Sequence, residues 1–168
     1  FSGELNPKRA KTDFSVPLSI TPSTEAIPSK GRIIFASRTH SQLAQVASAL
    51  RQLQVDPLPR YVQLGSRQQL CVNKEVNKLK SAQLINDRCA ELQKVNQCGY
   101  RHNLDPLKAK IQREILDIEE LVKEGKTSHS CAYYAARESA DYVEVVALPY
   151  ALLLVAKTRD ALHLDLHN

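Results

Sequence analysis

The sequence of 168 residues contains no methionine, and its first residue is Phe1. Because an initiator residue is missing, we expect an internal fragment of a longer protein. No apolar run approaches the ~20 residues that span a bilayer, and the first residues lack the charged-then-apolar pattern of a secretory signal. These absences predict a soluble intracellular setting without a membrane partner.

Catalytic signatures are also missing. No serine, histidine and acid arrangement typical of a hydrolase stands out, so no catalytic residue is predicted. Residues 125–127 spell the Gly-Lys-Thr that ends a P-loop, but Glu120 occupies the position of its first glycine, and the tripeptide ends a predicted helix. His163, Asp165 and His167 are more typical of a polar chain end than of a metal cluster.

The charge balance is mildly basic, with 23 Lys plus Arg against 18 Asp plus Glu. A net charge of +5 favours a polyanionic partner without requiring one. The apolar content of 43 % is ordinary for one globular domain, with or without a small insertion. Residues 1–30 are rich in proline, serine and threonine, and we expect a flexible polar linker or a surface insertion there. Their basic cluster at residues 8–11 is more typical of solvated charge than of a binding site.

The hydrophobic pattern predicts an α/β unit in residues 31–66. Residues 32–36 are β-branched and aromatic, which is typical of a strand buried on both faces of a parallel sheet. Apolar residues then recur at helical spacing from Ser41 to Leu53, before two prolines stop the pattern. Residues 61–64 form the next predicted strand, which completes a strand-helix-strand unit.

A helical segment follows. Residues 71–97 show helical spacing, and a single helix is predicted from Asp105, as its N-cap, to Gly125. Residues 143–148 read as a strand that returns to the sheet, followed by a helix over 151–156. Two α/β pieces therefore flank a helical insertion.

A compact polar turn lies between the first predicted strand and its helix. Unpaired N–H groups at a helix N-terminus favour an anion, and an arginine fork matches a phosphate. The turn therefore suits a nucleic-acid backbone, but an ordinary capped turn with Arg38 in solvent fits equally well. The candidate DNA-binding residues are Ser37, Arg38, Thr39, His40, Ser41 and Gln42.

The cysteines are the second candidate site. Cys71, Cys89, Cys98 and Cys131 are separated by 17, 8 and 32 residues, which matches neither a zinc ribbon nor a ferredoxin. Spacing alone favours buried free thiols over a metal site. Against this, the insertion has few other means of building a core, and four thiolates around one centre would hold its ends together.

Several stretches resemble the Fe-S cluster DNA helicases of superfamily 2, the group that includes XPD and FANCJ. Residues 33–43 resemble motif Ia of that family, and residues 64–71 resemble the entry to its cluster domain. Residues 84–89 most resemble the ChlR (chromosome-loss) branch. Residues 131–134 and 147–150 resemble the segments that close the cluster domain and re-enter the motor.

The resemblance implies a partial RecA-like (P-loop NTPase) domain with a helical Fe-S insertion. Motor domain 1 would comprise residues 31–66 and 136–168, and the Fe-S cluster domain residues 67–135. It also implies a 4Fe-4S cluster held by the four cysteines, with Arg67 beside it, in an ATP-dependent 5′ to 3′ helicase. ATP and Mg²⁺ would bind only in the full-length protein, because the Walker A and Asp-Glu-Ala-His motifs are absent here.

The implied partners are single-stranded DNA and the fork junction, with cohesion or replication factors for the full protein. The implied setting is the nucleus, in sister-chromatid cohesion and DNA repair. Two positions depart from the family pattern, since Gly99 and Ala132 stand where proline usually follows the third and fourth cysteines. The alternative is a non-enzymatic nucleic-acid-binding module in which the cysteines hold zinc or remain free.

Overall fold

The computed structural model describes residues 31–160 and 162. The predicted linker at residues 1–30 and the histidines at 163 and 167 therefore lie outside the described residues. The elements in chain order are β1 (Ile33–Ser37), α1 (His40–Arg51), β2 (Tyr61–Gln63), α2 (Arg67–Leu70), α3 (Lys74–Asn77), α4 (Ala82–Lys94), η2 (Gly99–Arg101), α5 (Asp105–Ile111), α6 (Ile118–Thr127), α7 (Ala132–Ser139), η3 (Ala140–Tyr142), β3 (Val145–Pro149), α8 (Ala151–Leu154) and α9 (Ala156–Asp160).

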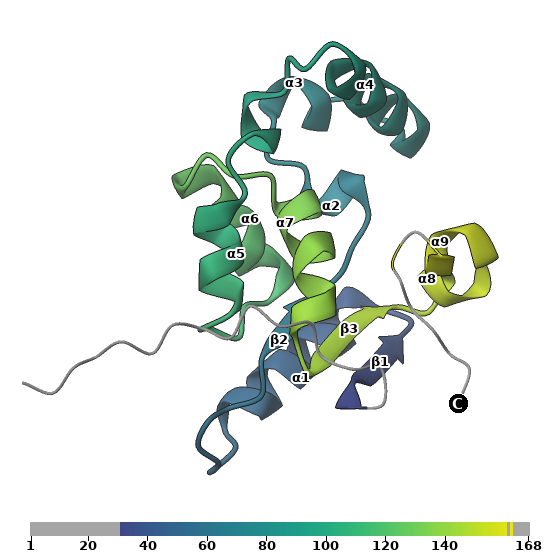
Figure 1. The fold of residues 1–168 in the computed structure, drawn as a ribbon. Helices are drawn as coiled ribbons and strands as arrows, with labels where there is room; N and C mark the ends of the chain where they lie inside the picture. Colours follow the sequence, from purple (N-terminus) through teal and green to yellow (C-terminus); the bar gives the residue numbers. More distant parts are fainter. Residues whose placement is uncertain (1–30, 161, 163–168) are drawn as a thin grey trace, which may run out of the picture.

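The described strands form one parallel sheet in the order β1-β3-β2 (Figure 1). Val145 of the central strand β3 lies opposite Ile33 on one side and Tyr61 on the other. The last of the described strands, β3, thus lies between the other two, and the helices from α2 to α7 are inserted before it. This arrangement confirms the predicted α/β fold with a helical insertion.

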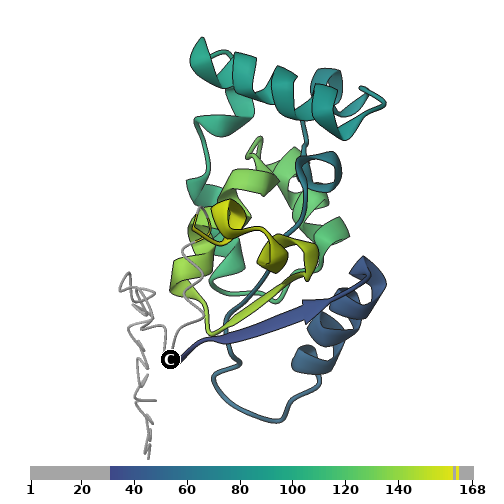
Figure 2. The same cartoon turned by 90° about the vertical axis from the view of Figure 1, so that its right-hand side faces the viewer.

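Alternating side chains divide the core between the two faces of the sheet. On one face, Leu43 and Ala47 of α1 pack against Tyr61, Val145 and Ala147. The opposite face packs against the helices of the insertion, chiefly α5, α6 and α7. Figure 2 shows the sheet and α1 at one end of the molecule and α3 and α4 at the other. The insertion is therefore built directly on the sheet.

The prediction that the first strand is buried on both faces is wrong. β1 is an edge strand of the described sheet, and Ile33 and Phe35 are 61% and 41% exposed. Only Ile34 packs against the main core, on the face opposite α1. An apolar run shows that its residues can be buried. It does not show whether another strand or helix packs against them.

The predicted single helix over residues 105–125 is two helices, α5 and α6, separated by residues 112–117. Asp117 ends the interruption, because its carboxylate accepts from the N–H groups of Glu119 and Glu120 at 3.0 and 2.9 Å. Glu120 in turn accepts from the Asp117 N–H at 2.9 Å, which completes a capping box. Arg51 donates to the Ile115 carbonyl inside the interruption at 2.9 and 2.6 Å, and this bond fixes the loop against α1.

Three smaller boundaries also differ from the prediction. Asp105 is the first residue of α5 and not its N-cap, which is Leu104. Gly125 lies inside α6, which continues to Thr127, and a Cβ there would stand 2.8 Å from the Ser130 carbonyl. The glycine serves a close approach of the chain and does not end the helix. The helix predicted over 151–156 is broken at Val155 into α8 and α9.

Residues 71–97 are helical as predicted, in two pieces. α3 ends at Asn77, and α4 begins after Ser81, whose side chain accepts from the Leu84 N–H at 3.1 Å. The two helices share a small core, separate from that of the sheet. Its buried members are Cys71, Val76, Ile85, Cys89, Leu92 and Cys98.

Within the part of the chain that the structure describes, no helix is both long and apolar enough to cross a membrane.

Candidate cysteine centre and nucleic-acid interface

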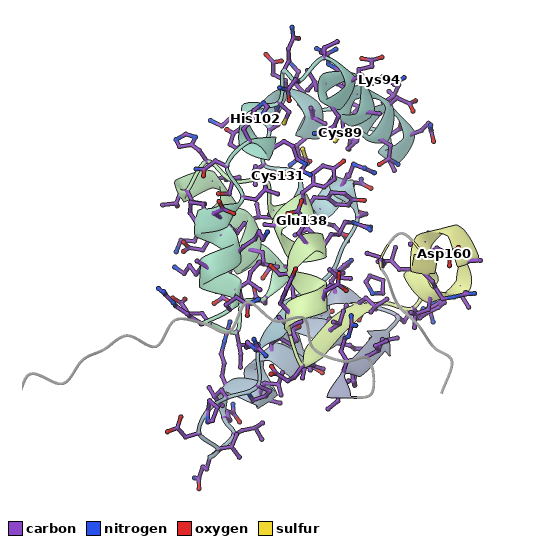
Figure 3. The ribbon with its side chains drawn as sticks, in the orientation of Figure 1. Cys89, Lys94, His102, Cys131, Glu138 and Asp160 are labelled. Carbon is purple, nitrogen blue, oxygen red and sulfur yellow. The ribbon has the colours of Figure 1, made fainter. Side chains whose placement is uncertain are left out.

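The four cysteines come from four separate positions of the insertion. Cys71 joins α2 to α3, Cys89 lies inside α4, Cys98 precedes η2, and Cys131 precedes α7. Each side chain is a free thiol and at most 9% exposed. Figure 3 shows Cys89 and Cys131 in the zone where α3 and α4 meet the rest of the insertion. The fold thus brings the cysteines to one junction.

Backbone hydrogen bonds fix these positions. The Cys71 N–H donates to the Arg67 carbonyl at 2.9 Å, which closes α2. The Cys131 N–H donates to the Tyr100 carbonyl at 2.8 Å, and this bond joins the segment after Cys98 to the start of α7. Cys71 and Cys131 are therefore held by local structure, and the bond from Cys131 ties together two segments that are distant in the sequence.

Burial sets the protonation of the thiols. It raises the pKa of Cys131 to about 11, helped by the nearby Cys71 and Cys98 and opposed by the first backbone amides of α7. The pKa of Cys71 is also raised by burial, with Cys89 and Cys98 close enough to add to the shift. The metal-free thiols of Cys71 and Cys131 are therefore protonated at neutral pH, and binding a metal there must release protons.

Four buried thiols are a donor set that an iron-sulfur cluster or a zinc ion can use, and the two need different spacings between the sulfurs. Among residues 31–160 and 162, no three His, Cys, Asp or Glu side chains are placed to hold a metal ion. A tetrahedral zinc with Zn–S bonds of about 2.3 Å needs sulfurs only ~3.8 Å apart. A 4Fe-4S cluster attaches each thiolate to a different iron, so it suits four thiols that share a junction without closing on one point.

Arg67 lies beside this junction. Its guanidinium stacks 4.3 Å from the ring centre of Tyr133 and 5.8 Å from that of Tyr134, and it donates to the Tyr134 hydroxyl at 3.2 Å. It also donates to Asn86 of α4 at 3.4 Å. Burial alone would lower the pKa of Arg67, but the hydrogen bond to Tyr134 and the charges of the tyrosines and Cys89 raise it. Arg67 therefore keeps its positive charge between α2, α4 and α7.

Two more arginines extend this stack. Arg101 lies 4.4 Å from the Tyr134 ring centre and pairs with Glu138, and Arg137 lies 4.4 Å from the Tyr133 ring centre. Burial lowers the pKa of Arg137. Cations and aromatic rings alternate through the junction, and each such contact contributes about 0.5–2 kcal/mol. The stack adds cation-π contacts to the apolar packing of α7 at this junction.

The predicted phosphate-binding turn forms as a capped helix start. Thr39 is the N-cap of α1 and accepts from the Gln42 N–H at 3.3 Å. The hydroxyls of Ser37 and Thr39 both donate to the Gln42 side-chain oxygen, at 2.5 and 3.1 Å. Arg38 and Ser41 are exposed. The structure therefore builds a preformed turn with a solvent-facing cation.

His40 links the turn to the insertion. Its pKa is lowered by burial, opposed by a hydrogen bond to Gln69 of α2. Ser66 holds Gln69 in place, because its N–H and hydroxyl donate to the Gln69 side-chain oxygen at 3.1 and 2.9 Å. His40 and Gln69 line one hollow of about 370 Å³ with Ile118, Glu119 and Val122. The turn at residues 37–42 and the segment at residues 64–71, which are separated by 21 residues in the sequence, thus meet in space.

The parallel sheet explains this meeting. The carboxyl ends of β1, β2 and β3 lie at one edge, which is where open α/β sheets bind ligands. The Tyr150 N–H donates to the Ser37 carbonyl at 2.9 Å, and the Leu64 N–H to the Ala147 carbonyl at 2.8 Å. The turn after β1 and the entry to α2 after β2 therefore leave the same edge of the sheet.

Sequence reasoning missed the aromatic part of the junction. Tyr133 and Tyr134 immediately follow the residue after Cys131, and Arg137 lies four residues beyond Tyr133 on the same helix. Two adjacent tyrosines beside a candidate ligand, with an arginine one turn away, were a usable signal. Asn73 contacts the sulfurs of both Cys71 and Cys98 in the structure, but no pattern in the sequence indicated this position.

Comparison with known proteins gives consistent relatives. Residues 35–168 match the DEAD_2 family. The chain is 40% identical over 156 residues to the ATP-dependent DNA helicase chl1 of Schizosaccharomyces pombe, covering 89% of this chain and 18% of that protein. It is 36% identical over 153 residues to the ATP-dependent DNA helicase DDX11 of Danio rerio, covering 77% of this chain and 17% of that protein. The chain therefore spans about a fifth of these relatives' length.

A solved structure shares the fold. The structure titled XPD_Helicase superposes with a TM-score of 0.51 at 18% identity, covering 81% of this chain and 23% of that one. At this identity the likeness concerns the fold alone. It confirms that the sheet and its helical insertion have the arrangement of part of a helicase.

Proposed function

Because this chain belongs to the DEAD_2 family, we propose that it is part of an ATP-dependent 5′ to 3′ DNA helicase. Residues 31–66 and 136–168 belong to the first motor domain in this proposal, and residues 67–135 form the Fe-S cluster domain. The observation that carries it is the meeting of four buried cysteines at the junction of α2, α4 and α7.

Cys71, Cys89, Cys98 and Cys131 are the proposed ligands of a 4Fe-4S cluster. Their support is a donor set of four buried thiols, with Cys71 and Cys98 close to Cys131 and with the charge of Arg67 close to Cys89. When bound, the cluster supplies four strong cross-links between segments that share little apolar core. The stacked Arg67, Tyr133 and Tyr134 then hold α2 against α7, so the domain resists force as one body.

Such rigidity suits a wedge that separates DNA strands at a fork. The turn at residues 37–42 is the proposed contact to the translocating single strand, because it exposes Arg38 and a helix N-terminus at the ligand-binding edge of the sheet. The proximity of His40 and Gln69, which line one hollow, supports mechanical coupling, because it places this turn against the start of the cluster domain.

ATP and Mg²⁺ are assigned to parts of the full-length protein beyond these residues. The Gly-Lys-Thr at residues 125–127 forms the end of α6 and not a loop before a helix, so it does not serve as a phosphate-binding loop. The identity to chl1 supports the ChlR branch, and we extend the proposal to a nuclear protein in chromosome cohesion, replication and DNA repair.

Replacing Arg38 with alanine is expected to weaken single-stranded DNA binding about tenfold at low salt, because one charged contact to a phosphate contributes roughly 1.5 kcal/mol. The slope of log affinity against log salt concentration should fall in magnitude by about 0.7, which is the loss of one phosphate contact. Fluorescence anisotropy with a labelled oligonucleotide at several salt concentrations measures both.

Arg113→Ala provides the control. Arg113 is also exposed and has no side-chain hydrogen bond or ion pair in the described residues, but it lies after α5 and away from the turn. The proposal predicts that this variant binds as the unchanged chain does. Equal weakening by both substitutions would assign the binding to overall charge and remove the turn from the interface.

A further inference from the structure

Asn73 connects two of the cysteines. Its backbone carbonyl accepts from the Cys71 thiol at 3.9 Å, and its side-chain Nδ2 donates to the Cys98 sulfur at 4.0 Å. Sulfur is larger than oxygen, so hydrogen bonds to it are longer than those between nitrogen and oxygen. One residue thus touches cysteines from the two ends of the α3–α4 segment.

The orientation of the Asn73 amide is fixed by a separate contact. Asn73 is the N-cap of α3, and its Oδ1 accepts from the Glu75 N–H at 3.0 Å. Only an oxygen can accept this bond, so the amide cannot turn over without losing the cap. The NH₂ group is therefore the end that points at Cys98.

The two sulfur contacts differ in direction. The Cys71 sulfur donates to Asn73, whereas the Cys98 sulfur accepts from the Asn73 Nδ2 and needs no hydrogen of its own for that contact. The side-chain contact to Cys98 is therefore compatible with a sulfur that holds a metal, and donors of this kind commonly orient metal ligands.

We propose that Asn73 is a positioning residue of this centre, whose side-chain amide holds the Cys98 thiolate in place and stabilises its negative charge. The inference rests on the proposed function, because it assigns Asn73 to the same cluster site. Cys98 needs such support, since it lies in the loop between α4 and η2 and is followed by Gly99, around which nothing lies within 4 Å of an added Cβ.

Asn73→Ser and Asn73→Asp test this role in the full chain. Both replacements keep an oxygen that can cap α3, but neither keeps the amide donor. Asn77→Ser is the matched control, because Asn77 is an exposed asparagine of the same helix whose side chain makes no hydrogen bond to a sulfur among the described residues. After anaerobic purification, four quantities are measured: the iron content, the rate of iron release to a chelator, the reduction potential of the cluster, and the thermal midpoint of the metal-free chain.

The expected result is iron release about tenfold faster in Asn73→Ser than in the unchanged chain and in Asn77→Ser. The reduction potential should shift to more negative values, and further in Asn73→Asp, because a donor to sulfur favours the reduced cluster and a carboxylate opposes it. The thermal midpoint of the metal-free chain should not change, which separates this role from capping.

Iron-loaded Asn73 variants with unchanged release and potential would overturn the assignment of Asn73 alone. If the chain without any substitution contains no iron after anaerobic purification, both the role of Asn73 and the proposed function are overturned. If Asn73→Ser lowers the thermal midpoint of the metal-free chain, Asn73→Asp distinguishes a role at the cluster from a role as helix cap. Aspartate caps a helix as well as asparagine does, so this variant loses only the amide donor. Normal release and potential in that variant would reduce Asn73 to a helix cap.

Discussion

Replacing Cys71 with serine is expected to remove most of the iron and to loosen α2, α3 and α4 before the sheet. Cys71 is buried at the joint between α2 and α3, and the small core there contains only six buried residues, three of them cysteines. In such domains the free energy of metal binding is a large part of the free energy of folding. Limited proteolysis should therefore cut first within residues 72–97, while fragments containing β1 and α1 persist.

The control for Cys71→Ser is the chain without substitutions, treated with a chelator to remove its metal. Another cysteine variant cannot serve as the control, because all four cysteines belong to the proposed site. If the effect acts through the metal, the variant and the stripped chain should give the same proteolytic pattern. Equal protease sensitivity of Cys71→Ser and the untreated, iron-loaded chain would contradict the structural role of the centre.

Valine in place of Gly125 is expected to lower the free energy of unfolding by about 3 kcal/mol, the upper part of the usual range for overpacking. A Cβ at this position would stand 2.8 Å from the Ser130 carbonyl, 3.1 Å from Val72 and 3.3 Å from Ala132. Val72 and Ala132 directly follow Cys71 and Cys131. Urea denaturation measures the stability loss, and iron analysis should show a lower content, because α6 would push both neighbours of the cysteines outward.

Gly99→Val is the matched control, because nothing lies within 4 Å of a Cβ added at Gly99. We expect that this variant stays within about 0.5 kcal/mol of the unchanged chain, as surface substitutions usually do. A Gly125→Val variant of normal stability would show that α6 and the Ser128–Ser130 segment are not held at the close distance described here.

Much of the fold followed from the sequence. β-branched runs predicted all three described strands, and helical spacing predicted α1, α3 and α4. The missed break between α5 and α6 has a local explanation. Ile111, Ile115 and Ile118 continue the helical period across residues 112–117, so spacing alone does not reveal the loop. The capping box of Asp117 and Glu120 was the available signal.

The exposure of β1 could not be predicted in the same way. Ile33 and Phe35 have the apolar character of buried positions, but burial depends on which element lies beside the strand. Order in the sheet is a long-range property, and β3, more than 100 residues later, occupies the central place. Hydrophobicity along the chain carries no information on that pairing.

For the candidate site, too, local features could be predicted from the sequence and long-range contacts could not. The cysteines, Arg67 and residues 37–42 were predicted from resemblance and helix-start chemistry, and the structure brings them to two linked places. The stack of Arg67 with Tyr133 and Tyr134 joins α2 to α7, and His40 of α1 and Gln69 of α2 line one hollow. Both are tertiary contacts between segments that are far apart in the sequence. No periodic pattern along the chain indicates that these segments meet. Their ligand and DNA-binding roles stay predictions.

The most direct test of the account is the metal content of the chain purified without oxygen. Four buried thiols at one junction predict broad visible absorption, about four irons and about four acid-labile sulfides per chain. Roughly one zinc per chain, or no metal with four free thiols, would contradict the iron-sulfur assignment and leave a nucleic-acid-binding module without a cluster.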